Sequence, residues 1–129
     1  MLTKHKLFFK DVSEIMNPTH IYANVVKELL KSVDNISGMA HITGGGLPEN
    51  LPRIIPKGLG IRINYDSWQL PRIFYKIMMA GEIPPEEMKR VFNLGIGYCV
   101  VISPQYEDHV RKIITGCGYN NWTIGDIVV

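Results

Sequence analysis

Apolar residues recur along the chain in two rhythms, one helical and one extended. Steps of three and four residues mark helices, as around Val25 and Leu29. Short apolar runs bounded by glycine or proline mark strands, and the run at 97–102 is apolar throughout, which is typical of a strand covered on both faces. The predicted helices are 18–34, a short turn that starts at Pro48, 66–81, 84–92 and 103–116. The predicted strands are 38–42, 59–63, 97–102 and 122–129.

Strands that alternate with helices predict a sheet with helices packed on it. Because 129 residues support one domain of ordinary size, we expect an α+β fold, with a mixed sheet of about four strands covered by helices. The apolar segment Leu7–Phe9 has no obvious partner nearby, and the last strand runs to the final residue. Both ends look cut from something larger. The expected core contains Ile21, Val25, Leu29, Phe74, Ile77, Val100, Ile102, Val110, Ile113 and Ile124.

Composition narrows the classes of function. The apolar fraction of 46% and the charged fraction of 20% are those of a soluble globular protein. A net charge of +2 is too small to argue for nucleic acid. Within 53–76, five basic residues stand against one acid, and such a local excess either attracts phosphate or forms a solvated basic face.

The cysteines and the apolar runs bear on metal binding and on the location of the protein in the cell. Cys99 and Cys117 make neither a disulfide framework nor a four-ligand metal site, and we predict no metal. No apolar stretch is long enough to cross a bilayer, and residues 1–10 carry no signal-peptide core. We therefore expect a cytoplasmic protein.

The strongest chemical signal is Gly44–Gly46, which lies between a predicted strand and the helical turn at Pro48. Bare N–H groups beside the positive end of a helix dipole suit a phosphate. A tight turn with left-handed backbone angles is the alternative, and it explains one glycine more easily than three. His41 and Thr43 flank the loop on the face opposite Ile42. They either address a bound ligand or are a half-buried histidine and a turn-capping threonine.

A second tight element, FNLGIG, occupies 92–97. Asn93 tolerates unusual backbone angles, and a simple turn accounts for one of the two glycines that follow it. The pair indicates close approach of another backbone or of a ligand. Neither a Walker-type Lys-Ser/Thr pair nor a dinucleotide-binding spacing accompanies any of these glycines.

The segment 40–53, AHITGGGLPENLPR, closely resembles a hallmark of the phosphoribosylformylglycinamidine cyclo-ligase family, also called aminoimidazole ribonucleotide (AIR) synthetase. Three further segments fall in register with that family: PTHIY at 18–22, FNLGIG at 92–97 and WTIG at 122–125. Arginine is usual in the family where His20 stands here. The resemblance covers about 17–127 and implies the fold of the family's C-terminal domain.

The resemblance also implies a division of the chain. Residues 1–16 are an N-terminal extension outside the family match, and 17–129 form the AIR synthetase C-terminal-like domain. Nothing in this sequence matches the N-terminal domain of the family, which forms the dimer and contributes the Mg-ATP-binding loops. The family's usual final strand is cut short here.

By resemblance, the function is ATP-dependent imidazole ring closure in de novo purine biosynthesis. ATP phosphorylates the formyl amide oxygen of formylglycinamidine ribonucleotide, and a nitrogen then attacks that carbon and expels phosphate. The glycine loop would hold the phosphate of this ribonucleotide or a phosphate of ATP. The same cleft would be lined by Thr43, Gly44, Gly45, Gly46, Asn50 and Asn93. His41 would handle a proton or contact phosphate.

ATP and Mg belong to the full-length family, and we expect neither to bind tightly to this chain alone. The chain by itself is therefore expected to be inactive. It is a fragment, a split subunit or a relic of the cyclo-ligase, or else a non-enzymatic phosphate- or nucleotide-binding module or regulatory partner that reuses the domain. The expected partners are formylglycinamidine ribonucleotide or phosphate, a separate ATP-binding domain and a second copy of the chain, and we expect neither nucleic acid nor membrane.

Overall fold

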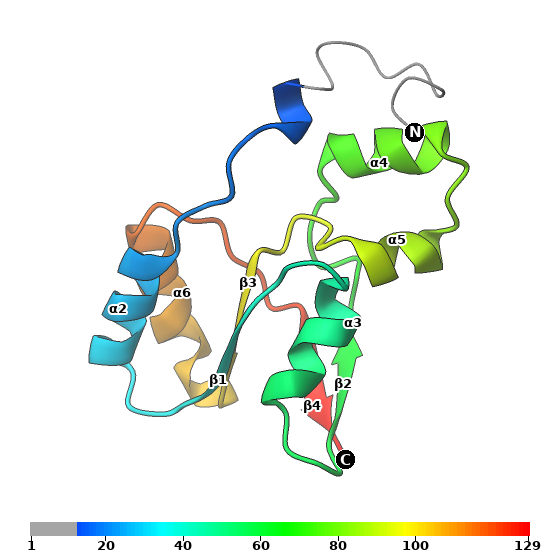
Figure 1. The fold of residues 1–129 in the computed structure, drawn as a ribbon. Coiled ribbons are helices and arrows are strands. Elements are labelled where there is room, and N and C mark those ends of the chain that lie inside the picture. The colour runs from blue at the N-terminus through cyan, green and yellow to red at the C-terminus, as the bar shows by residue number, and fades with distance from the viewer. Residues whose placement is uncertain (1–12) are drawn as a thin grey trace.

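The computed structural model describes residues 13–129, whose ribbon is drawn in Figure 1. The apolar segment Leu7–Phe9 and most of the predicted extension at 1–16 lie outside the described residues. The helices are α2 (Ala23–Ser32), α3 (Gly46–Asn50), α4 (Arg72–Ala80), α5 (Pro85–Val91) and α6 (Glu107–Gly116), with 3₁₀ turns η1 (Leu51–Ile54) and η2 (Pro104–Tyr106). The strands are β1 (Ile36–His41), β2 (Gly60–Ile63), β3 (Tyr98–Ile102) and β4 (Gly125–Val128). This order confirms the α+β class.

The strands pair two by two. β1 is antiparallel to β3, and β2 is antiparallel to β4, which gives two separate two-stranded sheets. The expected single mixed sheet of about four strands is therefore not confirmed for residues 13–129. Apolar patterning locates strands and their buried faces, but it does not determine which edges meet, because pairing depends on the elements that pack around each strand.

α2 and α4 begin later than the sequence predicts, each for a local reason. α2 starts at Ala23, and Ile21, which was expected in the core, is 81% exposed. The carbonyl of Ile21 accepts a hydrogen bond from the Tyr119 hydroxyl at 2.9 Å, which fixes this backbone outside the helix. α4 starts at Arg72 because a residue before proline, here the one preceding Pro71, avoids the helical region.

The predicted cap of α4 at Asp66 or Ser67 forms a turn of its own. The Asp66 N–H donates to the Asn64 side-chain oxygen at 3.0 Å, and the Ser67 hydroxyl donates to the Asn64 carbonyl at 2.8 Å. These polar groups are thereby engaged before the chain reaches α4.

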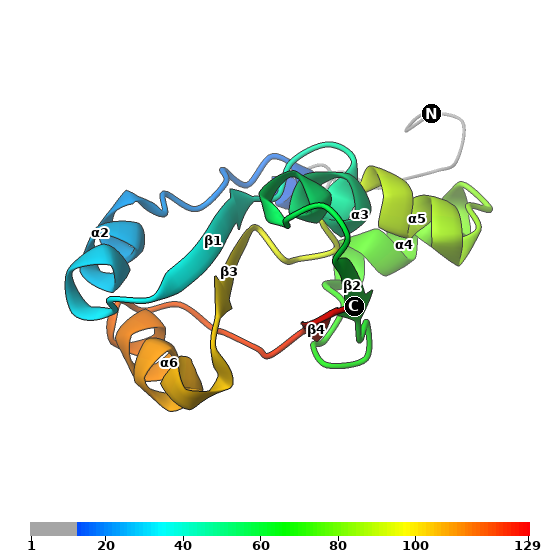
Figure 2. The same ribbon diagram turned by 90° about the horizontal axis from the view of Figure 1, so that it is seen from below.

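The buried side chains form two clusters. The α2–α6 cluster contains Val25, Leu29, Val33 and Val110. The glycine-loop cluster contains Ala40, Ile42, Leu47, Leu51, Trp68, Met88, Leu94, Ile96 and Cys99. The β1–β3 pair lies between them, since its residues alternate between the two clusters, and Figure 2 shows α2 and α6 together on one side of it.

Most of the predicted core is confirmed. Val25, Leu29 and Val110 are buried. Phe74, Ile77 and Ile124 pack against the glycine-loop cluster, and Val100, Ile102 and Ile113 pack against the α2–α6 cluster. Within residues 13–129, none of the helices has the length and apolar character needed to span a membrane.

Candidate phosphate-binding site

The glycine loop is a tight turn between β1 and α3. The N–H of Gly46 donates to the Thr43 carbonyl at 3.1 Å, which closes the turn. Gly45 has φ +92° and Gly46 has φ +57°, both in the left-handed region that favours glycine. The turn alternative therefore accounts for two of the three glycines, and Gly44 is the one that the backbone angles do not require.

The three glycines also differ in what a side chain at each position would contact. A Cβ atom at Gly46 would lie 2.6 Å from the Phe92 carbonyl oxygen and closer still to that of Lys89, so Gly46 lets the loop touch the end of α5. A Cβ atom at Gly45 would collide with the side chain of Glu49. At Gly44 a Cβ atom would meet nothing within 4 Å. Gly44 thus borders open space in front of the loop.

Asn50 holds the loop from behind. It is buried, with 4% of its surface exposed, and its side-chain amide donates to the carbonyls of Gly46 at 2.7 Å and Gly44 at 3.2 Å. The sequence groups Asn50 with the ligand-lining residues, and the structure gives its amide a positioning role. The exposed face of the loop is left to backbone groups.

His41 and Thr43 are exposed and Ile42 between them is buried, so the predicted alternation is confirmed. The His41 ring stacks on that of Tyr98, its cross-strand partner, with centroids 6.2 Å apart. Its edge also meets Tyr22, with centroids 5.8 Å apart. His41 therefore belongs to an aromatic cluster next to the loop.

The sequence analysis did not predict this aromatic cluster. Tyr22 lies at its centre and contacts the rings of His20, His41, Tyr98 and Tyr119. The sequence signal for it was Gly97, one of the paired glycines that indicated a close approach. The approaching group is the Tyr22 hydroxyl, with which any side chain at position 97 would collide. Burial raises the pKa of the Tyr22 phenol.

Asn93 shapes the second tight element. Its side-chain oxygen accepts a hydrogen bond from the Gly95 N–H at 3.0 Å. The positive backbone angles in this element are those of Leu94, at φ +53°, and Gly95, at φ +97°. The Leu94 carbonyl accepts a hydrogen bond from the Trp68 indole at 2.9 Å, which stabilises that conformation. The structure brings this element against the loop through Phe92 and Gly46.

Comparison with known proteins shows what this arrangement is similar to. A family model described as "AIR synthase related protein, C-terminal domain" matches residues 3–129. The chain belongs to this family. Proteins named phosphoribosylformylglycinamidine cyclo-ligase are similar to it: that of Prochlorococcus marinus (strain MIT 9211) is 46% identical over 116 residues, and that of Pseudothermotoga lettingae is 48% identical over 115 residues. The chain spans about a third of the length of these relatives, and the alignments cover 90% and 89% of the chain.

The charges next to the glycine loop are mixed. Glu49 lies in the first turn of α3, against Gly45. On α5, Lys89 is paired with Glu86 at 2.6 Å and Arg90 with Glu87 at 2.6 Å. The hydrogen bond to Glu86 raises the pKa of Lys89. An anion at the loop would therefore rely on backbone N–H groups more than on an unpaired cation.

Side chains that could ligate a metal are scattered over the described residues. Within residues 13–129, no three His, Cys, Asp or Glu side chains gather in an arrangement that holds a metal ion. A metal site built wholly from such side chains is therefore absent from the described residues.

Proposed function

We propose that this chain supplies the C-terminal, substrate- and phosphate-contacting part of a phosphoribosylformylglycinamidine cyclo-ligase. The observation that carries the proposal is the 46–48% identity to proteins of that name over about nine-tenths of the chain. The reaction would be ATP-dependent closure of an imidazole ring in purine biosynthesis.

The role of the chain follows from the glycine loop. The N–H groups of Gly44 and Gly45 are the donors that we assign to a phosphate of formylglycinamidine ribonucleotide or of ATP, since the Gly46 N–H already donates to Thr43. Open space at Gly44 lets the ligand approach the backbone closely. Asn50 keeps these groups in place by bonding the loop carbonyls from the buried side.

His41 and Thr43 lie on the exposed side of the same strand end. We assign the Thr43 hydroxyl to ligand contact and the His41 imidazole to phosphate contact or proton handling. When bound, ATP supplies the phosphoryl group that makes the amide oxygen a leaving group. We assign the ATP-binding part of the site to the part of the cyclo-ligase that the chain does not span.

The test of the activity combines two polypeptides. The 129-residue chain is co-expressed with the part of the Pseudothermotoga lettingae relative that its alignment does not cover, and ATP-dependent ring closure is measured. We expect ring closure by the combination and none by either polypeptide alone. ATP turnover by the chain alone, or an inactive combination whose two polypeptides co-purify, would contradict the proposed function.

A phosphate titration tests the loop itself. In the chain alone, the amide resonances of Gly44 and Gly45 should shift on addition of inorganic phosphate. Gly44→Ala should weaken this response because its methyl group enters the open space, while Gly116→Ala, at another position with nothing within 4 Å, should leave it unchanged. If the Gly44 and Gly45 resonances do not shift, the assignment of phosphate binding to the glycine loop is wrong.

A further inference from the structure

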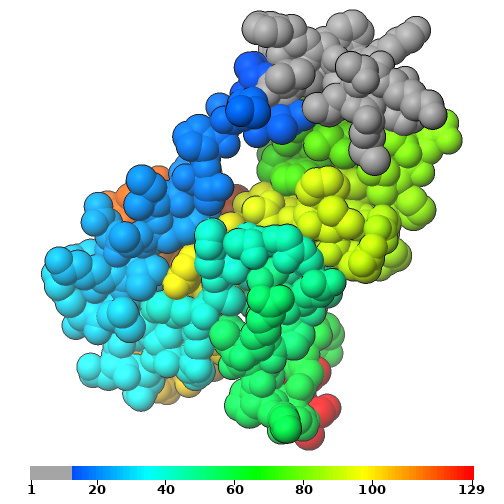
Figure 3. All heavy atoms as spheres, viewed as in Figure 1, coloured from blue at the N-terminus to red at the C-terminus, as the bar shows by residue number. Residues whose placement is uncertain are grey.

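A groove of about 640 Å³ runs between the two core clusters. Its walls come from both halves of the molecule: Val25 and Leu29 of α2, Val110 and Ile114 of α6, and Ile61 and Ile63 of β2. Figure 3 shows a hollow on one face of the molecule, between the blue segment before α2 and the yellow turn before β3. His20 and Gly95, from these two segments, also line the groove.

The groove lies along the edges of two strands. All residues of β3, 98–102, line it, as do the consecutive residues 125–127 of β4. Successive side chains of a strand point to opposite faces. Since consecutive residues of each strand line the groove, their backbones border it, and this fits a groove that runs along the strand's edge. Within residues 13–129, β3 pairs only with β1 and β4 pairs only with β2, so each strand has one unpaired edge.

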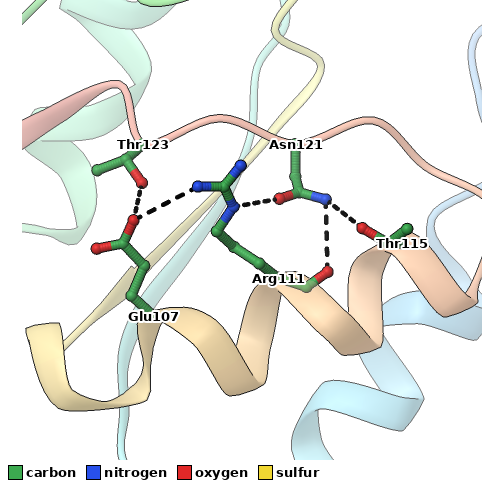
Figure 4. A network of polar contacts seen from close by, with 5 residues as sticks. All are labelled: Glu107, Arg111, Thr115, Asn121 and Thr123. Atoms are coloured by element: carbon green, nitrogen blue, oxygen red, sulfur yellow. Dashed lines mark hydrogen bonds and ion pairs between the residues drawn. The ribbon is translucent and has the colours of Figure 1, made fainter.

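A network of polar contacts holds the wall of the groove between α6 and β4, as Figure 4 shows. Asn121 accepts a hydrogen bond from the Arg111 guanidinium at 3.0 Å and donates to the Thr115 hydroxyl at 2.9 Å. Glu107 accepts a hydrogen bond from the Thr123 hydroxyl at 2.5 Å and pairs with Arg111 at 3.8 Å. The segment that leads into β4 is thereby tied to α6.

The chemistry of the lining defines what fits. About half of the residues that line the groove are valine, leucine or isoleucine, with tyrosines and a tryptophan among the rest. Its carboxylates are paired, Glu107 with Arg111 and Asp126 with Arg62. An occupant must therefore be apolar on both faces. Along its edges it must also offer a row of N–H and C=O groups, since unpaired backbone groups are costly when buried. An extended polypeptide strand meets both requirements.

We propose that this groove receives an extended, apolar segment of polypeptide from outside these 129 residues, inserted as a strand between the edges of β3 and β4. This inference rests on the proposed function, because the source of the segment is the part of the cyclo-ligase sequence that the chain does not span. With strands about 4.8 Å apart and sheets about 10 Å apart, 640 Å³ holds roughly four residues of one strand. That length is about one residue less than β3, which has five.

The relatives favour this source over a second copy of the chain. The two relatives named above are about three times as long as the chain, so each carries a large part with no counterpart here. A second copy would bring only the same elements, whose described strands are already paired. The second copy is kept as an outcome of the test.

Hydrogen exchange tests the proposal without ATP or substrate. The full chain is measured alone and co-purified with the uncovered part of the Pseudothermotoga lettingae relative. We expect the amides of β3 and β4 to exchange at least tenfold more slowly in the pair, and those of α4 to be unchanged. Unchanged β3 and β4 exchange in a stable pair would overturn the proposal. Slow β3 and β4 exchange already present in the chain alone would overturn the proposal and indicate that this chain's own residues fill the groove. Slow exchange that appears only as the chain concentration rises would overturn it in favour of a second copy.

A matched pair of substitutions locates the contact. Val101 lines the groove and belongs to neither core cluster, so Val101→Lys should weaken association at least tenfold. Val91, 40% exposed on α5 and outside the groove, provides the control, and Val91→Lys should bind as the parent does. Equal binding by both variants would contradict the proposal. Should Val101→Lys fail to fold, the exchange measurement on the unaltered chain tests the proposal in its place. Slowed exchange at β3 and β4 in an inactive pair would leave this inference standing and the proposed function refuted.

Discussion

Gly44 and Gly46 stand two residues apart and differ in what a side chain would meet. Gly46 has a positive φ and lies against two carbonyl groups at the end of α5, whereas Gly44 borders open space with no such angle. Gly46→Ala should therefore lower the free energy of unfolding by about 2 kcal/mol or more, through overpacking and backbone strain. Gly44→Ala should change it by less than about 0.5 kcal/mol, as at an ordinary surface position. Urea unfolding of both variants checks this, and equal losses would contradict the assignment of Gly46 to packing.

Cys99 should make the free energy of unfolding decrease at alkaline pH. It is buried in the glycine-loop cluster, and this burial raises the pKa of its thiol from 9.0 to about 12. The unfolded chain therefore loses the thiol proton before the folded chain does, and stability falls as pH rises from about 9 towards 12. Between pH 9 and pH 10 this one group should remove about 1 kcal/mol.

The measurement compares two pH profiles. Burial also raises the pKa values of the Tyr22 and Tyr65 phenols. Urea unfolding of the parent and of Cys99→Ala at pH 8, 9 and 10 isolates the thiol, because both tyrosines contribute to both profiles. The variant will be less stable at every pH because it opens a cavity, so only the difference in slope counts. Parallel profiles would show that Cys99 does not titrate as its burial requires.

At the scale of elements, the sequence located every described strand within a few residues and missed how the strands associate. The apolar run of β3 predicted cover on both faces correctly, since Cys99 lies in one cluster and Val100 packs against the other. It did not predict that one edge of β3 stays unpaired, because side-chain polarity reports on faces and not on edges. The single mixed sheet was expected from four good strand signals, and pairing partners are long-range information that such signals lack.

The candidate site shows the same division. The glycine loop and the alternation at His41 and Thr43 were predictable from local pattern. The inward role of Asn50 was not, because a buried amide and an exposed one look identical in sequence until the fold places them. The aromatic cluster around Tyr22 was also missed, since its members come from segments far apart along the chain.

The segment between α6 and β4 offers a prediction at this scale. Asn121→Ala removes the bonds to Arg111 and Thr115, so the segment should loosen and the β4 amides should exchange faster. Because the network is solvent-accessible, the global free energy of unfolding should fall by no more than about 1 kcal/mol. Asn120→Ala, at the exposed neighbouring residue, is the control. Unchanged β4 exchange in Asn121→Ala would mean that β2 alone holds β4 in place.

For the molecule as a whole, the groove that divides the core bears on cooperativity. Domains of this size usually have one contiguous core. Here the α2–α6 cluster and the glycine-loop cluster lie on opposite sides of the β1–β3 pair, and the groove separates them elsewhere. Two clusters joined through one strand pair should open with different free energies in native-state hydrogen exchange.

Leu29 and Leu47 form a matched pair for testing this division. Each is 1% exposed, Leu29 in the α2–α6 cluster and Leu47 in the glycine-loop cluster. Truncation of either to alanine should cost about 2–5 kcal/mol within its own cluster. In native-state hydrogen exchange, Leu29→Ala should therefore lower the protection of α2 and α6 amides more than that of α3 and α5 amides, and Leu47→Ala should do the reverse. Equal loss throughout the chain in both variants would show that the β1–β3 pair couples the clusters into one unit. A strand in the groove would contact both clusters and couple them. In the complex with the uncovered part of the relative, Leu29→Ala and Leu47→Ala should therefore lower amide protection in the same helices to similar extents.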